Sequence, residues 1–275
     1  MTKRTSHIAR LLSRFTHSLR PTAYSLLFLL VTAYSLQPTA CFAQVHPHSF
    51  SPRQLGIMQA WYRVDAITGL ADGDPVASWV DSTANARTLT QSTADYRPAY
   101  KVSIQNGRPA IRFDGTNDLL TGAFAGSLQF TVFSVQRPDI VTYLNTVYAE
   151  VGSYLNLWAI FGDPGPPARI WFGFTYLPAG QSDYIAVHPI STAVPELWTL
   201  RYDQSWWRSW VNGGALNPKA ETNSPKVGTT INVGSWSQSV RQFDGDIFEL
   251  AFFNVALSDR DRQRVERYLL RKWGL

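Results

Sequence analysis

Short apolar segments alternate with polar turn residues along most of the chain. The segments are rich in β-branched and aromatic residues and are bounded by Gly, Asp, Asn and Pro, which is the pattern of β-strands. No helical pattern separates them, so we expect an all-β, two-sheet antiparallel sandwich. The predicted strands are residues 60–65, 77–81, 87–91, 109–114, 128–136, 155–162, 168–176, 183–188, 197–203, 206–212, 229–234 and 246–254.

A helix is predicted at each end of this β-rich region. Ser51 followed by Pro52 is typical of a helix start and predicts one short N-terminal helix. Near the C-terminus, Ser258 and Asp261 have the spacing of a capping box, and apolar residues recur at helical spacing up to Trp273. This apolar stripe favours docking of the C-terminal helix on the sandwich. A stripe that binds a partner is the alternative.

The first 43 residues have the pattern of a secretory signal peptide. Basic residues without any acidic residue precede the apolar run 24–36, and small residues surround the bond after Ala43. We therefore expect a signal peptide at 1–43, a lead-in with a short helix at 44–54 and one β-sandwich domain at 55–275. A retained signal anchor and a lipoprotein with its lipid on Cys41 are the alternatives. The expected location is secreted, periplasmic or at the cell surface, without membrane insertion after cleavage.

Charge bears on whether the protein binds nucleic acid, and cysteine content bears on whether the sandwich has a disulfide. The chain has 25 Lys and Arg against 20 Asp and Glu, and five of the basic residues lie in the predicted signal, so the remainder is formally neutral. No basic cluster is visible there, and we therefore expect no nucleic-acid partner. The single cysteine, Cys41, also lies in the predicted signal, so the expected sandwich has no disulfide.

Five blocks stand in a recognisable order along the chain: "ASWVDSTANARTLTQ", "RPAYKVSIQNGRPAIRFDGTNDLL", "LQFTVFSVQRP", "RSWVNG" and "FDGDIFELAFFNVALSDRDRQRVERYLLRKWGL". Together they resemble secreted bacterial laminin G-like (LamG-like) domains of the concanavalin A-like lectin/glucanase superfamily. The piece "GDIFELAFFNVALS" also looks like the closing segment of pentraxins. This resemblance covers roughly residues 55–275 and implies a jelly-roll sandwich that binds sugars or proteins.

The block "FDGTNDLL" concentrates Asp114, Asn117 and Asp118 within a few positions. These residues are turn formers whose side chains bond nearby backbone N–H groups, and a plain turn is the favoured interpretation. A Ca²⁺ site is the alternative, since Ca²⁺ takes six to eight oxygen ligands and many LamG-like domains hold it at the rim. Asp118 would be its main ligand. The acidic residues that pentraxins supply before the last strand are missing from "SWSQSVRQF".

Catalysis by a glycosidase would need two carboxylates at a defined separation. The nearest candidates are Asp244, Asp246 and Glu249. Strand alternation predicts that Asp246 and Glu249 lie on opposite faces, and Asp244 belongs to a turn. We therefore predict no catalytic residues. A polysaccharide hydrolase or lyase on the same fold is the alternative.

Tryptophan mixed with polar planar groups gives the main functional prediction. Sugar rings stack on indole and their hydroxyls bond polar groups, so this mixture is typical of a carbohydrate-binding platform. We predict a non-catalytic lectin-like or adhesion module that binds a polysaccharide or glycan. A LamG-type adhesion domain that binds a cell-surface protein, with simply buried tryptophans, is the alternative. The predicted contact residues are Trp158, Trp171, Arg201, Arg208 and Trp210.

Overall fold

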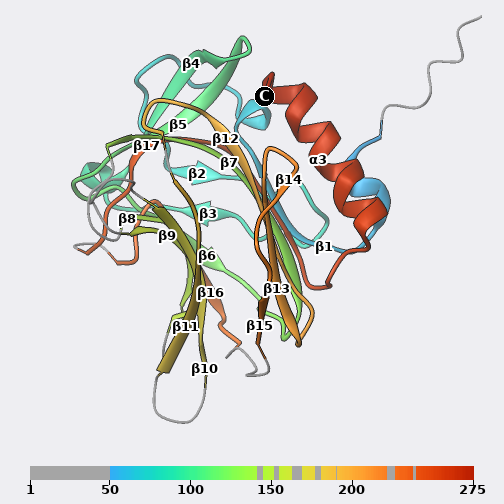
Figure 1. The fold of residues 1–275 in the computed structure, drawn as a ribbon. Coiled ribbons are helices and arrows are strands. Elements are labelled where there is room, and N and C mark those ends of the chain that lie inside the picture. Colours follow the sequence, from blue (N-terminus) through green and yellow to red (C-terminus); the bar gives the residue numbers. More distant parts are fainter. Residues whose placement is uncertain are drawn as a thin grey trace, which may run out of the picture. The chain divides into compact units, whose positions relative to one another are not determined.

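The computed structural model describes residues 50–140, 145–151, 155–162, 169–176, 181–189, 191–221, 227–237 and 240–275. Phe50–Leu275 forms one compact unit of two antiparallel sheets and, among the described residues, one α-helix, α3 (Asp259–Trp273) (Figure 1). This confirms the predicted two-sheet sandwich with a C-terminal helix, while the jelly-roll connectivity stays a prediction. The predicted signal peptide and most of the lead-in lie outside the described residues.

The first sheet has nine strands in the order β14-β13-β12-β7-β17-β5-β4, with β1 beside β17 and β15 beside β13. All of its pairs are antiparallel. The strands are β1 (Met58–Arg63), β4 (Ala99–Gln105), β5 (Arg108–Asp114), β7 (Phe130–Ile140), β12 (Glu196–Tyr202), β13 (Trp206–Val211), β14 (Gly214–Ala215), β15 (Lys219–Ala220) and β17 (Asp244–Phe253).

The second sheet has eight strands in the order β11-β10-β9-β8-β16-β6-β3-β2. They are β2 (Ser78–Trp79), β3 (Leu89–Thr90), β6 (Leu120–Ala123), β8 (Asn145–Val151), β9 (Leu155–Gly162), β10 (Arg169–Tyr176), β11 (Gln181–Pro189) and β16 (Thr230–Val233). The described residues also form three 3₁₀ turns: η1 (Pro52–Leu55) precedes β1, η2 (Val64–Ala66) follows β1, and η3 (Ala94–Tyr96) lies between β3 and β4. The predicted N-terminal helix is thus the single 3₁₀ turn η1, and Ser51 makes no side-chain cap bond there.

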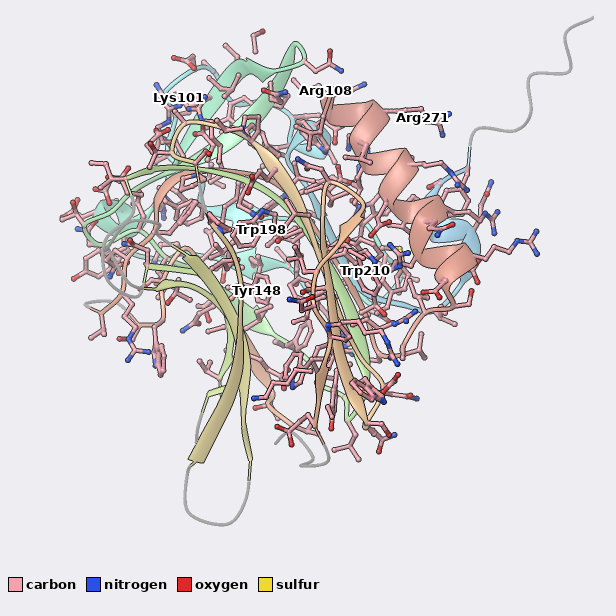
Figure 2. The ribbon with its side chains drawn as sticks, viewed as in Figure 1. Lys101, Arg108, Tyr148, Trp198, Trp210 and Arg271 are labelled. Atoms are coloured by element: carbon pink, nitrogen blue, oxygen red, sulfur yellow. The ribbon has the colours of Figure 1, made fainter. Side chains whose placement is uncertain are left out.

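The main core lies between the sheets. Alternate residues of each strand point inward, so that Leu250 and Phe252 of β17 and Ile231 of β16 belong to one buried cluster. The rings of Tyr148 and Phe252, from opposite sheets, meet edge to face at 5.4 Å. Figure 2 shows Tyr148 and Trp198 in the space between the sheets. This core fixes which residues of each strand face outward.

A second apolar cluster lies on the outer face of the first sheet, beneath α3. The predicted N-cap is confirmed, because Ser258 Oγ accepts the Asp261 backbone N–H at 3.2 Å. The apolar stripe of the helix is buried against β17, with the Trp273 and Phe248 rings 5.2 Å apart. The predicted docking of this helix on the sandwich is therefore confirmed. No helix among the described residues is long and apolar enough to cross a membrane.

Candidate functional site on the outer sheet faces

Asp114, Asn117 and Asp118 close the turn between β5 and β6. Asp114 Oδ1 accepts the backbone N–H groups of Thr116 at 2.8 Å and Asn117 at 3.3 Å. Asp118 Oδ2 accepts the N–H of Asp114 at 2.9 Å. Gly115 between them has a φ of +70°, which glycine adopts without strain. The carboxylates of Asp114 and Asp118 therefore accept backbone N–H groups of the turn, as the sequence analysis expects of a plain turn.

Asp118 is buried in this turn, and its environment disfavours the charged form. Burial and the nearby charge of Asp114 raise the pKa of Asp118 to about 7. In the register of β17 with β5, Asp244 lies opposite Asp114, and the pKa of Asp244 is also raised, mainly by burial. Within the described part of the chain, no group of three or more His, Cys, Asp or Glu residues is arranged to hold a metal ion. The Ca²⁺ alternative therefore stays a prediction.

The predicted opposite orientation of Asp246 and Glu249 is wrong. A bulge between Ile247 and Glu249 shifts the register of β17 against β7, so both carboxylates lie on the outer face of the first sheet. Asp246 accepts two bonds from Arg112, at 2.8 and 2.9 Å, and one from Arg137 at 2.6 Å.

Glu249 is engaged under α3. Its carboxylate accepts bonds from Lys272 Nζ at 2.6 Å and from the indole N–H groups of Trp61 at 2.7 Å and Trp273 at 2.9 Å. Like Asp246, Glu249 is therefore neutralised by a neighbouring cation. Although the bulge puts both carboxylates on one face, neither is left free to act as the acid or base of a glycosidase pair.

The five predicted contact residues do not form one surface. Trp158 and Trp171 lie on β9 and β10 of the second sheet, whereas Arg201, Arg208 and Trp210 lie on β12 and β13 of the first. The prediction assumed that strands consecutive in sequence are neighbours, but the chain changes sheet between β11 and β12. The side chains of Trp158 and Trp171 lie outside the described parts.

Arg201 and Trp210 are covered by α3 and are only 8 % and 7 % exposed. The guanidinium carbon of Arg201 lies 5.2 Å from the Trp210 ring centroid, and that of Arg262 lies 3.9 Å from it. Arg201 Nη1 also donates to the Leu257 carbonyl at 2.8 Å. Figure 2 shows Trp210 on the side of the first sheet that faces the helix. A sequence pattern does not show which sheet face a distant helix covers, and a role of these two residues in ligand binding stays a prediction.

Arg208 remains near the surface at the end of the first sheet. It pairs with Asp203 and lies 5.7 Å from the ring centroid of Trp206. The Trp206 side chain is 40 % exposed. Trp206 is not among the predicted contact residues, although strand alternation puts it on the same face as Arg208. Trp206 and Arg208 together form a small aromatic and charged surface on the outer face of the first sheet.

A longer feature, missed by sequence reasoning, crosses the whole second sheet. Cross-strand pairing places one residue from each of the eight strands in a continuous row. Their sequence neighbours Trp79, Leu89, Leu120 and Ile231 belong to the inter-sheet core, so the row lies on the outer face. We call it the outer row. In strand order from β2 to β11 it is Ser78, Thr90, Thr121, Asn232, Ala149, Trp158, Gly173 and Tyr184.

The outer row is uncharged and is solvent-accessible at its β2 end. Ser78 and Thr90 are exposed and Thr121 is half-buried. Their hydroxyls make no side-chain hydrogen bond with any described residue, so they are available to a ligand. Asn232 is nearly buried, and its amide donates to the Trp236 carbonyl at 2.8 Å. The adjacent outward positions Ala123 and Thr230 are also uncharged.

Comparison with known proteins supports the fold. No protein-family model and no curated protein sequence matches this chain. Domain 4 of AbnA, an extracellular GH43 arabinanase from Geobacillus stearothermophilus solved with arabinotriose, superposes with a TM-score of 0.52 at 16 % identity. That match covers 76 % of this chain and 97 % of the arabinanase domain.

The receptor-binding domains of botulinum neurotoxins have a similar fold. Type G matches with a TM-score of 0.58 at 12 % identity, and serotype D with 0.59 at 10 %. These matches cover 78 % and 80 % of this chain but only 51 % and 53 % of the toxin chains, so this chain spans about half their length. At such identities the likeness concerns the β-sandwich alone. Membership of the LamG-like or concanavalin A-like families stays a prediction.

Proposed function

We propose that this protein is a non-catalytic, lectin-like carbohydrate-binding module, and that the outer face of the second sheet is its glycan-binding surface. The outer row carries this proposal. Ser78, Thr90 and Thr121 present free hydroxyls from three neighbouring strands, which can donate to and accept from sugar hydroxyls. Neighbouring strands are about 4.8 Å apart, a spacing comparable to one sugar ring of an extended glycan.

The composition of the row indicates the class of glycan. None of its residues carries a charge. A row of residues without charges gives an anionic polysaccharide no compensation for the hydration that it loses there, so a neutral glycan is favoured. Trp158 and Tyr184 occupy row positions on β9 and β11, and aromatic residues are the usual stacking partners of sugar rings. The exposed and half-buried row residues lie on β2, β3 and β6, so the glycan would run across these three strands, short of Ala149, which is buried.

Two further observations support this proposal. The arabinanase domain with the same fold was solved with arabinotriose, which makes a sugar-binding role reasonable for a similar sandwich. The signal-like N-terminus agrees with export of the protein to the cell exterior, and polysaccharides are found there. A hydrolase is disfavoured because Asp246 and Glu249 are held in ion pairs. Among the residues that the structure describes, we find no comparable surface that favours a protein-binding adhesion role.

Affinity electrophoresis in gels cast with neutral and acidic polysaccharides tests the proposal. We expect retardation on at least one neutral polymer without release of reducing ends. Thr121→Arg places a bulky charge in the middle of the outer row and should weaken binding at least about tenfold, which is about 1.4 kcal/mol. Thr192→Arg, at an exposed turn outside the row, is the matched control and should bind like the unchanged protein.

Each contrary outcome has a distinct meaning. If no polymer retards the protein, the proposal is wrong. Retardation that survives Thr121→Arg would move the site away from the outer row, with Trp206 and Arg208 as the next surface to test. Release of reducing ends would make the protein an enzyme.

A further inference from the structure

The outer row ends at a pocket. β2 is the terminal strand of the second sheet, and a pocket of about 330 Å³ lies beside it. Ser78 belongs both to the row and to the pocket lining. A glycan lying along the row would therefore reach this pocket as it leaves the sheet. The other lining residues used below are Arg63, Ile67, Leu70, Pro75 and Val80.

The pocket is held in place by its surroundings. Ile67 and Leu70 pack against the inter-sheet core, so two of its walls are fixed by the fold. Two backbone bonds just before Pro75 hold its loop to β4: the Gly73 N–H donates to the Tyr100 carbonyl at 2.7 Å, and the Tyr100 N–H donates to the Asp74 carbonyl at 2.8 Å. A pre-formed concave site of this size is typical of small-molecule binding.

The chemistry of the pocket differs from that of the row. Its walls are mostly aliphatic, and none of the described residues that line it is acidic. Arg63 is the one cation of the lining and is held by Asp65 at 3.4 Å and by the Trp61 ring at 4.9 Å. A bare sugar would leave these aliphatic walls facing water, whereas an apolar group would cover them. Arg63 and the Ser78 hydroxyl can donate to an acceptor at its mouth.

We infer that this pocket binds an acyl group ester-linked to the glycan, with the acyl chain or ring on the aliphatic walls and the ester carbonyl at the polar mouth. This inference rests on the proposed function for its sugar part. The ligand class is then an O-acylated neutral polysaccharide. The pocket then distinguishes acylated chains from bare ones, while the row supplies contacts common to both.

The first test uses a probe without any sugar. Methyl ferulate, an aromatic acyl ester, is titrated into the ¹⁵N- and ¹³C-methyl-labelled protein and followed by NMR. We expect the methyl signals of Ile67, Leu70 and Val80 to shift. Val80 is 61 % exposed, so Val80→Asp should fold normally and raise the dissociation constant at least about tenfold, because a carboxylate would lose hydration against the ester. Val194→Asp, at a valine that is 45 % exposed elsewhere, is the matched control.

The second test compares an acylated polysaccharide with its alkali-deacylated form in the same gels. Stronger retardation of the acylated polymer, lost in Val80→Asp but kept in Val194→Asp, supports the inference. Equal retardation of both polymers, with no methyl shift, would overturn it and leave the proposed function standing. Methyl shifts without retardation on any polymer would keep the pocket and refute the glycan role of the row.

Discussion

The guanidinium carbon of Arg262 lies 3.9 Å from the centroid of the Trp210 ring, and this stack joins α3 to β13. Arg262 also pairs with Glu266 at 2.5 Å, and both side chains are almost fully buried. The buried Arg262–Glu266 ion pair, stacked on the Trp210 ring, therefore forms part of the contact between α3 and the first sheet. Such a pair is costly to break from one side, since the remaining charge stays buried without a partner.

Arg262→Ala should lower the free energy of unfolding by about 3 kcal/mol, because it strands the Glu266 carboxylate and removes the stack on Trp210. Urea denaturation followed by tryptophan fluorescence measures this change. Arg260→Ala, at an exposed position of the same helix, should change the free energy by less than about 0.5 kcal/mol. If both variants unfold at the same urea concentration, the buried pair does not stabilise the helix.

Glu150 should lower the stability of the folded protein as the pH rises towards neutrality. It is buried at the rim of the core, where Gly228 N–H donates to it, and burial raises its pKa to about 7. Its unfolded pKa is lower, so the folded state binds more protons between about pH 4.5 and 7 and stability falls as pH rises through that window. At pH 8 Glu150→Gln should be more stable than the unchanged protein by about 2 kcal/mol.

At pH 4 the two proteins should be equally stable, because Glu150 is then protonated in both states. Melting temperatures across this pH range check the prediction. A parallel pH dependence in both proteins would contradict it. No local sequence pattern indicates that Glu150 is buried, because its burial depends on the packing of the two sheets.

Asp118 should contribute a second part of the same pH dependence. Its pKa is raised to about 7 by burial and by Asp114, so its ionisation also destabilises the folded protein as pH rises towards neutrality. Asp118→Asn keeps an acceptor for the Asp114 N–H and should be more stable than the unchanged protein above pH 7. Combined with Glu150→Gln, it should remove most of the loss between pH 5 and 8, measured by thermal unfolding.

The response of the melting temperature to Ca²⁺ distinguishes two roles of Asp114, Asn117 and Asp118: a plain turn and a cation site. If these side chains serve only the turn, millimolar Ca²⁺ or a chelator should leave the melting temperature unchanged. A cation bound only by the folded state would raise it as the Ca²⁺ concentration rises. Such a rise, absent in Asp118→Asn, would establish the cation site.

Local features of the fold were predictable because they depend on short-range physics. The period-2 pattern located most strands, and the capping box at Ser258 located α3. Asn212 and Gly213 form the turn between β13 and β14 with φ values of 49° and 80°, which both residues tolerate. The pattern missed β4, β6 and β8 and the two-residue strands β14 and β15; in β4 and β8, polar residues such as Lys101 and Asn145 interrupt the apolar positions.

The candidate site was less predictable because it depends on pairing between distant segments. The outer row joins Ser78 to Tyr184 through seven cross-strand pairs, and no local pattern specifies those partners. The bulge before Glu249 and the cover of α3 over Trp210 are likewise set by tertiary packing. Sequence reasoning therefore identified suitable residue types but grouped Trp158 and Trp210, which belong to different sheets.

Because α3 covers the first sheet, the proposed binding surface lies on one side of the sandwich only, and this would fix the orientation of the bound protein. Its two broad faces are unequal, since one carries a helix and ion pairs and the other carries the outer row. Bound to a flat polysaccharide surface through the row, the molecule would hold α3 towards the solution. A fluorophore on exposed Arg260 would then stay open to a soluble quencher in the bound state, while one beside Thr90 would be shielded.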